Sequence, residues 1–167
     1  MADPIDRYII PPITRQTGLL IAGLISTALL GGALLFQYLG GLAPCSLCIW
    51  QRWPHLAVMI LALAGLRGIQ PRLMLMLICL VGVISAGLGA YHAGVEWRLW
   101  SGPTGCTASL ALDGNIAVIT DQLLATPLVR CDEVAWSLFG LSMAGWNALI
   151  SLDIVAIALI SLRKIAR

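Results

Sequence analysis

The sequence predicts an all-α membrane protein, a bundle of four transmembrane helices. Hydrophobic residues make up 59% of its 167 positions and charged residues only 11%, against about 45–50% and about 25% in soluble domains. The mean hydropathy is +0.92, and one core of this size cannot bury so much apolar surface. A soluble globular domain is therefore excluded. A net charge of +2 without a basic run also argues against nucleic-acid binding.

Four apolar stretches are long enough to cross a bilayer, which takes about 20 residues in a helix. The predicted spans are 18–39, 49–66, 73–95 and 136–162. The first and third contain no charged residue. The sequence therefore predicts four spans joined by three connections.

The second and fourth spans carry unusual residues. Arg52 lies near the start of the second span and Pro54 follows it, so we expect the helix to bend or restart there. Asp153 in the fourth span falls near the bilayer midplane, where an acid is a functional candidate. We expect it to be protonated or hydrogen-bonded and to face other helices, near Ser85 or Ser151, rather than to lie on a proton path.

Two loops, 40–48 and 96–135, lie on the same side of the predicted bundle. The longer loop should carry extramembrane function. Between its turn signals four apolar residues recur at helical spacing, namely Ile116, Ile119, Leu123 and Leu124. They predict a short amphipathic helix on the membrane surface, with a helix packed over the end of the bundle as the alternative. No repeat or linker is found, so we expect residues 1–167 to form a single integral membrane domain.

The distribution of basic residues predicts the orientation. Seven of the ten Lys and Arg residues lie on the side of the termini and of the connection between the second and third spans; these are Arg7, Arg15, Arg67, Arg72, Arg163, Lys164 and Arg167. The positive-inside rule then places both termini in the cytoplasm. The loops 40–48 and 96–135 face outward, which in a bacterium is the periplasm.

Four of the five cysteines fall in these outward loops, where disulfides can form: Cys45, Cys48, Cys106 and Cys131. Cys79 lies inside the third span, and we expect it to act as a small buried hydrophobe. The cysteines of the two loops are therefore the candidate reactive groups.

Cys45 and Cys48 form a C-x-x-C motif that can close an exchangeable disulfide. A helix that begins here would direct its N-terminal N–H groups at the sulfurs and favour a thiolate. Arg52, one helical turn after Cys48, would add a positive charge on the same face. Two other interpretations remain open, an inert disulfide with Arg52 reaching lipid headgroups, and a zinc site.

Thiol oxidation releases two electrons, and the chain has no haem or dinucleotide motif to accept them. Quinone is the acceptor that a membrane offers. We expect it beside the C-x-x-C motif, with Arg52 and His92 near its oxygens. His55 and Glu96 are weaker candidates, because His55 lies deeper along its helix and a carboxylate at the rim is usually solvated.

These features together resemble the DsbB disulfide bond formation proteins of Gram-negative inner membranes. The resemblance covers nearly the whole chain. Its most specific parts are two segments, Pro44-Cys45-Ser46-Leu47-Cys48-Ile49-Trp50-Gln51-Arg52 and Arg130-Cys131-Asp132-Glu133-Val134-Ala135-Trp136-Ser137-Leu138-Phe139-Gly140.

The resemblance implies a relay that reoxidises a DsbA-like periplasmic thioredoxin-fold protein and passes electrons to ubiquinone or menaquinone, with no metal. Cys106 would form the mixed disulfide with the partner, Cys131 would exchange with Cys45, and Cys48 would contact the quinone. Arg52 would stabilise the Cys48 thiolate and the quinone.

His92 matches the quinone-proximal histidine of the family less closely. Gln51 departs from the family, since some members carry an acid at this position. Arg130 would assist Cys131 by lowering the pKa of its thiol, with a simply solvated loop arginine as the alternative.

Two other functions compete with this relay. A vitamin K epoxide reductase-like protein also has four helices and two cysteine pairs. Its C-x-x-C motif comes late in the bundle, whereas here the motif follows the first span. A metal-binding or structural membrane protein with inert cysteines is the alternative outside redox chemistry.

Overall fold

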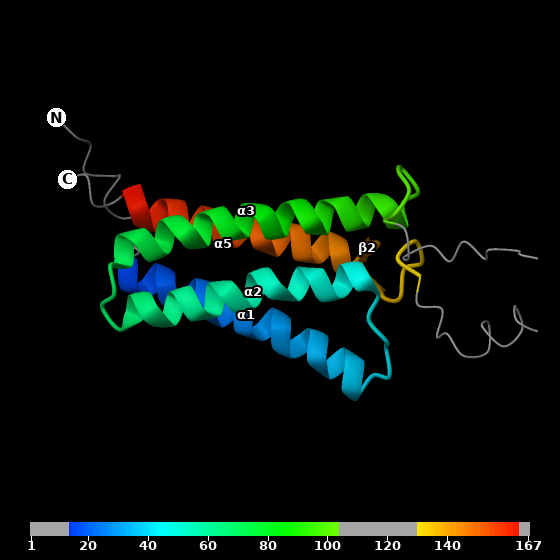
Figure 1. Ribbon diagram of the computed structural model, residues 1–167, viewed down its shortest axis with the longest axis horizontal. Helices are drawn as coiled ribbons and strands as arrows, with labels where there is room; N and C mark the ends of the chain where they lie inside the picture. Colours follow the sequence, from blue (N-terminus) through cyan, green and yellow to red (C-terminus); the bar gives the residue numbers. More distant parts are fainter. Residues whose placement is uncertain (1–13, 104–129, 164–167) are drawn as a thin grey trace, which may run out of the picture.

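The computed structural model describes residues 14–103 and 130–163. Four long helices run side by side as a bundle (Figure 1). They are α1 (Arg15–Tyr38), α2 (Ser46–Leu66), α3 (Pro71–Glu96) and α5 (Met143–Arg163). Each is long and apolar enough to cross a membrane, so the predicted four-span fold is confirmed.

The first three helices begin and end within three residues of the predicted spans, and side chains at the helix starts explain the differences. Thr14 accepts a hydrogen bond from the Thr17 backbone N–H and starts α1 at Arg15, as an N-cap residue does. Pro71 occupies the first turn of α3, where its missing N–H costs nothing. The helix α2 begins directly after Cys45 and continues without interruption through Pro54, so the helix does not restart at Pro54.

The fourth helix begins later than predicted. Residues 137–142 form a small antiparallel hairpin, β1 (Ser137–Leu138) paired with β2 (Leu141–Ser142). Its two turn residues, Phe139 and Gly140, both have positive φ, which a tight hairpin turn requires. Ser142 Oγ then accepts a hydrogen bond from the Gly145 N–H at 3.2 Å and caps α5. The predicted start at residue 136 is therefore wrong.

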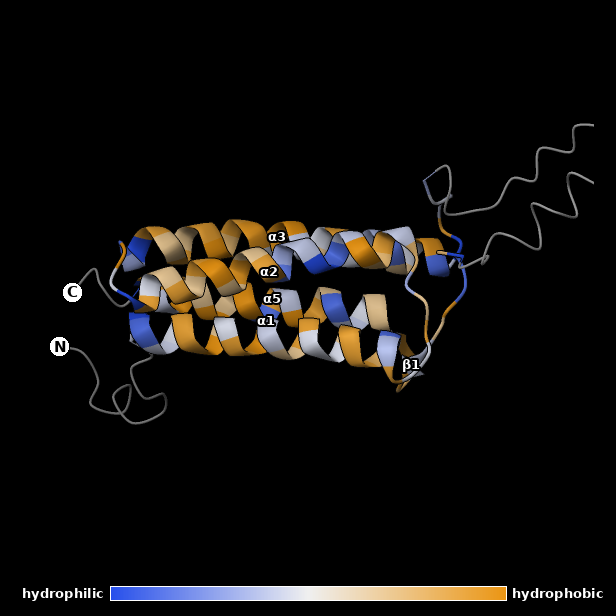
Figure 2. Cartoon of the chain, turned by 60° about the horizontal axis from the view of Figure 1, so that its bottom comes forward, coloured by the Kyte–Doolittle hydropathy of each residue, from blue (hydrophilic) through white to orange (hydrophobic). Residues whose placement is uncertain are grey.

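The buried core lies between the helices and is built from apolar residues of all four. Small residues allow close approach: a Cβ on Gly89 would lie 2.8 Å from the backbone nitrogen of Ala148. The outer faces remain apolar as well. Figure 2 shows hydrophobic colour over most of the length of the helices and hydrophilic colour in the turns at the ends. This distribution is typical of a bundle whose outer surface meets lipid.

The two ends of the bundle differ. The start of α1, the end of α5 and the turn between α2 and α3 lie together at one end (Figure 1), which brings Arg15, Arg67, Arg72 and Arg163 to that end. The start of α2, the end of α3 and the β hairpin lie at the opposite end, which we call the cysteine end because it holds Cys45, Cys48 and Cys131.

One unusual residue of the spans is placed differently from expectation and another is placed as expected. Asp153 lies on the exposed face of α5, whereas we expected it to face other helices, because Ile154 and Ala158 turn toward the core instead. Cys79 packs against the core as predicted. The expected amphipathic helix with Ile116 to Leu124 lies outside the described residues, as do Arg7, Lys164 and Arg167.

Candidate redox site at the cysteine end

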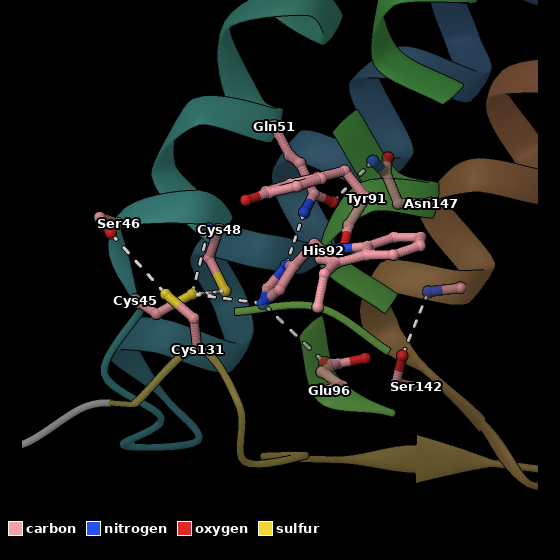
Figure 3. A network of polar contacts seen from close by, with 12 residues as sticks. Cys45, Ser46, Cys48, Gln51, Tyr91, His92, Glu96, Cys131, Ser142 and Asn147 are labelled. Atoms are coloured by element: carbon pink, nitrogen blue, oxygen red, sulfur yellow. Dashed lines mark hydrogen bonds and ion pairs between the residues drawn. The ribbon is translucent and has the colours of Figure 1, made fainter. Parts of the chain in front are cut away.

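The C-x-x-C motif occupies the N-terminal end of α2. Cys45 is the N-cap residue, and its sulfur accepts a hydrogen bond from the Cys48 backbone N–H at 3.2 Å. The Cys45 thiol in turn donates to Cys48 Sγ across 2.8 Å. Both cysteines are free thiols. The cap geometry therefore holds the two sulfurs facing each other, as Figure 3 shows.

Cys45 is the more enclosed of the two thiols. It is 4% exposed, and its hydrogen bond to Cys48, burial and the nearby Cys48 charge all raise the pKa of the Cys45 thiol. Cys45 is therefore the proton-holding member of the pair, and Cys48 is the acceptor sulfur.

Cys131 brings a third sulfur to the same place. It is fully buried and disulfide-bonded, and its Sγ lies 3.7 Å from the Ser46 hydroxyl. The sulfurs of Cys45 and Cys131 and a ring nitrogen of His92 lie within 4.8 Å of one another. The structure thus brings together residues 85 positions apart in the chain. Cys106, the remaining predicted site cysteine, lies outside the described residues.

His92 links the thiols to a buried polar network (Figure 3). Its Nε2 lies 3.6 Å from Cys45 Sγ and its Nδ1 lies 2.7 Å from the Gln51 amide nitrogen. The Asn147 amide donates to Gln51 Oε1, and Asn147 Oδ1 lies 2.7 Å from His55 Nε2. The structure places His92 against Cys45, and its expected action on an electron acceptor stays a prediction.

Glu96 is buried, contrary to expectation. Its side chain is only 6% exposed, with Oε1 4.0 Å from His92 Nε2. Its Oε2 has no hydrogen-bond partner among the described residues. The close packing at the end of α3 explains this, since neighbouring Val95 is fully buried against Cys45 and Cys131.

Arg52 is held by the first helix. Its guanidinium donates to Gln37 Oε1 at 2.6 Å and to the Ala33 carbonyl at 3.5 Å. Sequence reasoning missed Gln37, although it is the only amide side chain between residues 18 and 39. An amide at that position in an apolar span is a signal for a buried polar partner.

Arg130 does not act freely on Cys131. Its guanidinium pairs with Asp132 at 2.7 Å and with Glu133 at 3.6 Å. The hydrogen bond and charge of Arg130 lower the pKa of Asp132. Much of the positive charge that we expected to act on Cys131 is therefore compensated by these two acids.

A cavity of about 270 Å³ opens beside the thiols. One wall is apolar and comes from α1 and α5, including Leu29, Phe36 and Met143. Its polar lining includes Cys48, Arg52, His92, Glu96 and Asn147. This combination suits a flat apolar molecule with polar atoms at one end.

Comparison with known proteins agrees with this geometry. The family model described as "Disulfide bond formation protein DsbB" matches residues 15–161. The chain belongs to the DsbB family. Among curated DsbB relatives, disulfide bond formation protein B of Methylococcus capsulatus is 34% identical over 88% of this chain and 93% of its own length.

Two further DsbB relatives are similar to this chain. Disulfide bond formation protein B of Pasteurella multocida is 33% identical over 86% of this chain and 85% of its own length. Disulfide bond formation protein B 2 of Pseudomonas aeruginosa is 34% identical over 86% and 83%. Membership of the DsbB family makes this chain a multi-pass membrane protein of disulfide bond formation.

Proposed function

We propose that this protein reoxidises a DsbA-like periplasmic thioredoxin-fold protein by disulfide exchange and passes the electrons to membrane quinone. The observation that carries the proposal is the position of the thiol pair. Cys45 and Cys48 face each other at 2.8 Å, close to the sulfur of Cys131, and they line one end of an apolar cavity. One sulfur pair can thus exchange with a loop cysteine on one side and meet an electron acceptor on the other.

The loop cysteines carry out the disulfide exchange with the partner protein. Thiolate attack on a disulfide requires an accessible attacking sulfur and a good leaving sulfur. Cys131 lies next to Cys45, so Cys131 exchanges with Cys45, and Cys106 forms the mixed disulfide with the partner. This assignment agrees with the roles that the family resemblance implies.

The cavity fits a quinone. Its apolar wall suits an isoprenoid-bearing ring, and the buried Glu96 Oε2 without a partner together with the Arg52 guanidinium provides polar atoms at the thiol end. When bound, the quinone accepts two electrons and two protons. Arg52, oriented by Gln37, would hold a positive charge beside Cys48 and would bind a quinone oxygen. Closing a disulfide between the Cys45 thiol and the Cys48 thiolate would release two electrons and one proton, and the second proton of this reduction would come from water at the cysteine end.

The orientation follows from the charges. Four arginines lie at the end opposite the thiols, and the positive-inside rule assigns that end to the cytoplasm. We therefore place the cysteine end in the periplasm of the bacterial inner membrane, where disulfides persist.

The proposal is tested with the purified protein in detergent and ubiquinone or menaquinone. Reduced DsbA-like protein should be oxidised while quinone absorbance falls, and Cys48→Ser should abolish quinone reduction. Cys79→Ser is the matched control, since Cys79 packs away from the site, and it should keep the parental rate. A Cys48→Ser variant that reduces quinone as fast as the parent would overturn the relay.

A metal centre is the competing function, because Cys45, His92 and Cys131 could contribute three ligands. The disulfide of Cys131 argues against it, since an oxidised sulfur is a poor zinc ligand and zinc needs a thiolate. Metal analysis of the purified protein separates the two. Stoichiometric zinc whose removal by chelator stops disulfide exchange would favour the metal centre.

A further inference from the structure

The buried polar network contains an arrangement that the proposed electron relay does not use. Two amides, those of Gln51 and Asn147, connect two histidines, His92 and His55, through three contacts of 2.7 Å each. We call this pair of amides the amide ladder. The amide ladder and the two histidines link α2, α3 and α5, and His92 contacts the Cys45 sulfur.

The amide ladder has two self-consistent directions. As drawn in Figure 3, Asn147 donates to Gln51 and the Gln51 amide nitrogen faces His92 Nδ1. An amide nitrogen only donates, so neutral His92 then carries its proton on Nε2 and donates toward Cys45. A half-turn of both amides exchanges each oxygen with its nitrogen and leaves the backbone in place. His92 then donates from Nδ1 to Gln51, and its unprotonated Nε2 can accept a proton.

The two amides must turn together. If only one turned, two N–H groups or two carbonyl oxygens would face each other inside the bundle, where no water replaces the lost hydrogen bond. His55, at the end of the network away from Cys45, can change its hydrogen bonds when the amides turn. Its Nε2 also lies 3.4 Å from the Ser85 hydroxyl, to which Ser151 donates. The tautomers of His92 and His55 are therefore coupled through the ladder.

The reactions of Cys45 use both hydrogen-bond directions of the amide ladder, because Cys45 needs a base in one step and a hydrogen-bond donor in another. As the Cys45–Cys48 disulfide closes, the Cys45 S–H bond breaks, the S–S bond forms, and two electrons leave for the quinone. The proton of Cys45 must reach a base, and His92 Nε2 is the nearest ring nitrogen in the described residues. When Cys45 is instead expelled as a thiolate from a disulfide with Cys131, a donor at the same position stabilises it.

Resting on the proposed function, we propose that His92 is the base that takes the proton of Cys45, and that the amide ladder of Gln51 and Asn147 positions His92 by setting its tautomer. Glu96 supports the charged form, because its carboxylate lies 4.0 Å from His92 Nε2. The titratable groups around His92 are Glu96 on α3 and Cys45 and Cys48 at the start of α2, while α5 contributes the neutral Asn147.

Nitrogen NMR of the full protein in detergent, with 15N-labelled histidine, tests the coupling directly. Asn147→Asp supplies acceptors only, so Gln51 must donate to it and turn its own oxygen toward His92. We expect His92 to become the tautomer with its proton on Nδ1. Asn147→Leu removes the ladder beyond Gln51, and His92 should then show a mixture of both tautomers. Asn147 is linked to His92 through Gln51, so identical His92 nitrogen shifts in all three proteins would overturn the coupling.

Single-turnover mixing of the reduced protein with quinone tests the role in the reaction. We expect Asn147→Leu, which leaves the tautomer of His92 unset, to slow quinone reduction by about tenfold with a larger solvent isotope effect, because proton transfer to the base becomes slower. We expect Asn147→Asp to recover most of the rate. Leu149→Ala, on the exposed face of the same helix, is the control and should keep the parental rate. Equal rates in the parent and Asn147→Leu would overturn the role.

The two proposals fail in different ways. If the parent does not reduce quinone at all, the proposed function is contradicted. The His92 nitrogen shifts then still show whether the amide ladder couples the two histidines. If the parent reduces quinone but the His92 nitrogen shifts do not change in the variants of residue 147, only the proposed coupling through the amide ladder is contradicted. If Asn147→Leu does not fold, the Asn147→Asp protein still tests the coupling, provided that it is folded and monodisperse.

Discussion

At the scale of single residues, the N-cap position of Cys45 accounts for the difference between two thiols only three positions apart. Cys45 caps the helix and donates to Cys48, and this hydrogen bond together with burial raises the pKa of the Cys45 thiol. The helix N-terminus favours negative charge on the sulfurs, but the pair shares one proton and Cys45 keeps it.

This arrangement predicts an effect of Cys48→Ala on the reactivity of Cys45. Removing the acceptor sulfur and its charge should lower the pKa of the Cys45 thiol toward its ordinary value. A raised pKa keeps the thiol protonated at pH 8, so the variant should have more Cys45 thiolate at that pH and react severalfold faster with an alkylating reagent. Mass spectrometry of the modified peptide at several pH values gives the rates. Unchanged or slower alkylation at Cys45 would contradict the shared proton.

Gln37 supports Arg52 in the same way that Gln51 supports His92. Gln37→Leu removes the 2.6 Å contact that orients the guanidinium while keeping the volume of the side chain. If Arg52 binds quinone as proposed, the KM for quinone should rise about tenfold, the cost of about 1.4 kcal/mol of lost binding. Gln16→Leu, the other amide of α1, is the control. Equal KM values in Gln37→Leu and the parent would show that Arg52 needs no support from α1.

At the scale of the helices, glycine decides how closely α3 and α5 approach. A methyl group on Gly89 would lie 2.8 Å from the Ala148 nitrogen and 3.0 Å from the Ala144 carbonyl oxygen. These are backbone atoms, which cannot rotate away as a flexible side chain can. Ala148 directly follows Asn147 in the chain, so helix spacing and the polar network depend on each other.

Gly89→Ala should therefore destabilise the bundle by about 1–3 kcal/mol, as overpacking does, and separate Asn147 from its partners. Gly87→Ala is the matched control on the same helix, since nothing lies within 4 Å of its added carbon, and it should be neutral or slightly stabilising. Thermal unfolding in detergent compares the two variants. A Gly89→Ala protein as stable as Gly87→Ala would mean that the two helices can move apart at no cost.

Some features of the helices were readable from the sequence, and others were not. The apolar stretches predicted the first three helices within three residues, because length and hydropathy are local properties. The start of α5 was misplaced because the hairpin around Phe139 and Gly140 lies in equally apolar sequence. The rotation of each helix about its own axis was also unreadable, which is why Asp153 and Glu96 were placed on the wrong faces.

At the scale of the whole molecule, the asymmetry of the basic residues predicts the orientation in the membrane. A periplasmic reporter enzyme fused after Gly68, in the turn between α2 and α3, should be inactive, and the same reporter fused after Pro103 should be active. Reporter activity in whole cells, normalised to the amount of fusion protein, measures this. The reverse pattern would place the cysteine end in the cytoplasm and rule out the proposed relay.

Composition, hydropathy and motif spacing are properties of the chain, so the membrane environment, the number of spans, the family and the candidate cysteines could be predicted from them. Which distant side chains meet became visible in the folded bundle: Cys131 beside Cys45, Gln37 on Arg52, and Gln51 and Asn147 between His92 and His55. The physical reason is that lipid exerts little preference among the faces of an apolar helix. Packing of small residues and pairing of the few buried polar groups therefore fix how each helix turns, and these contacts involve all four helices at once.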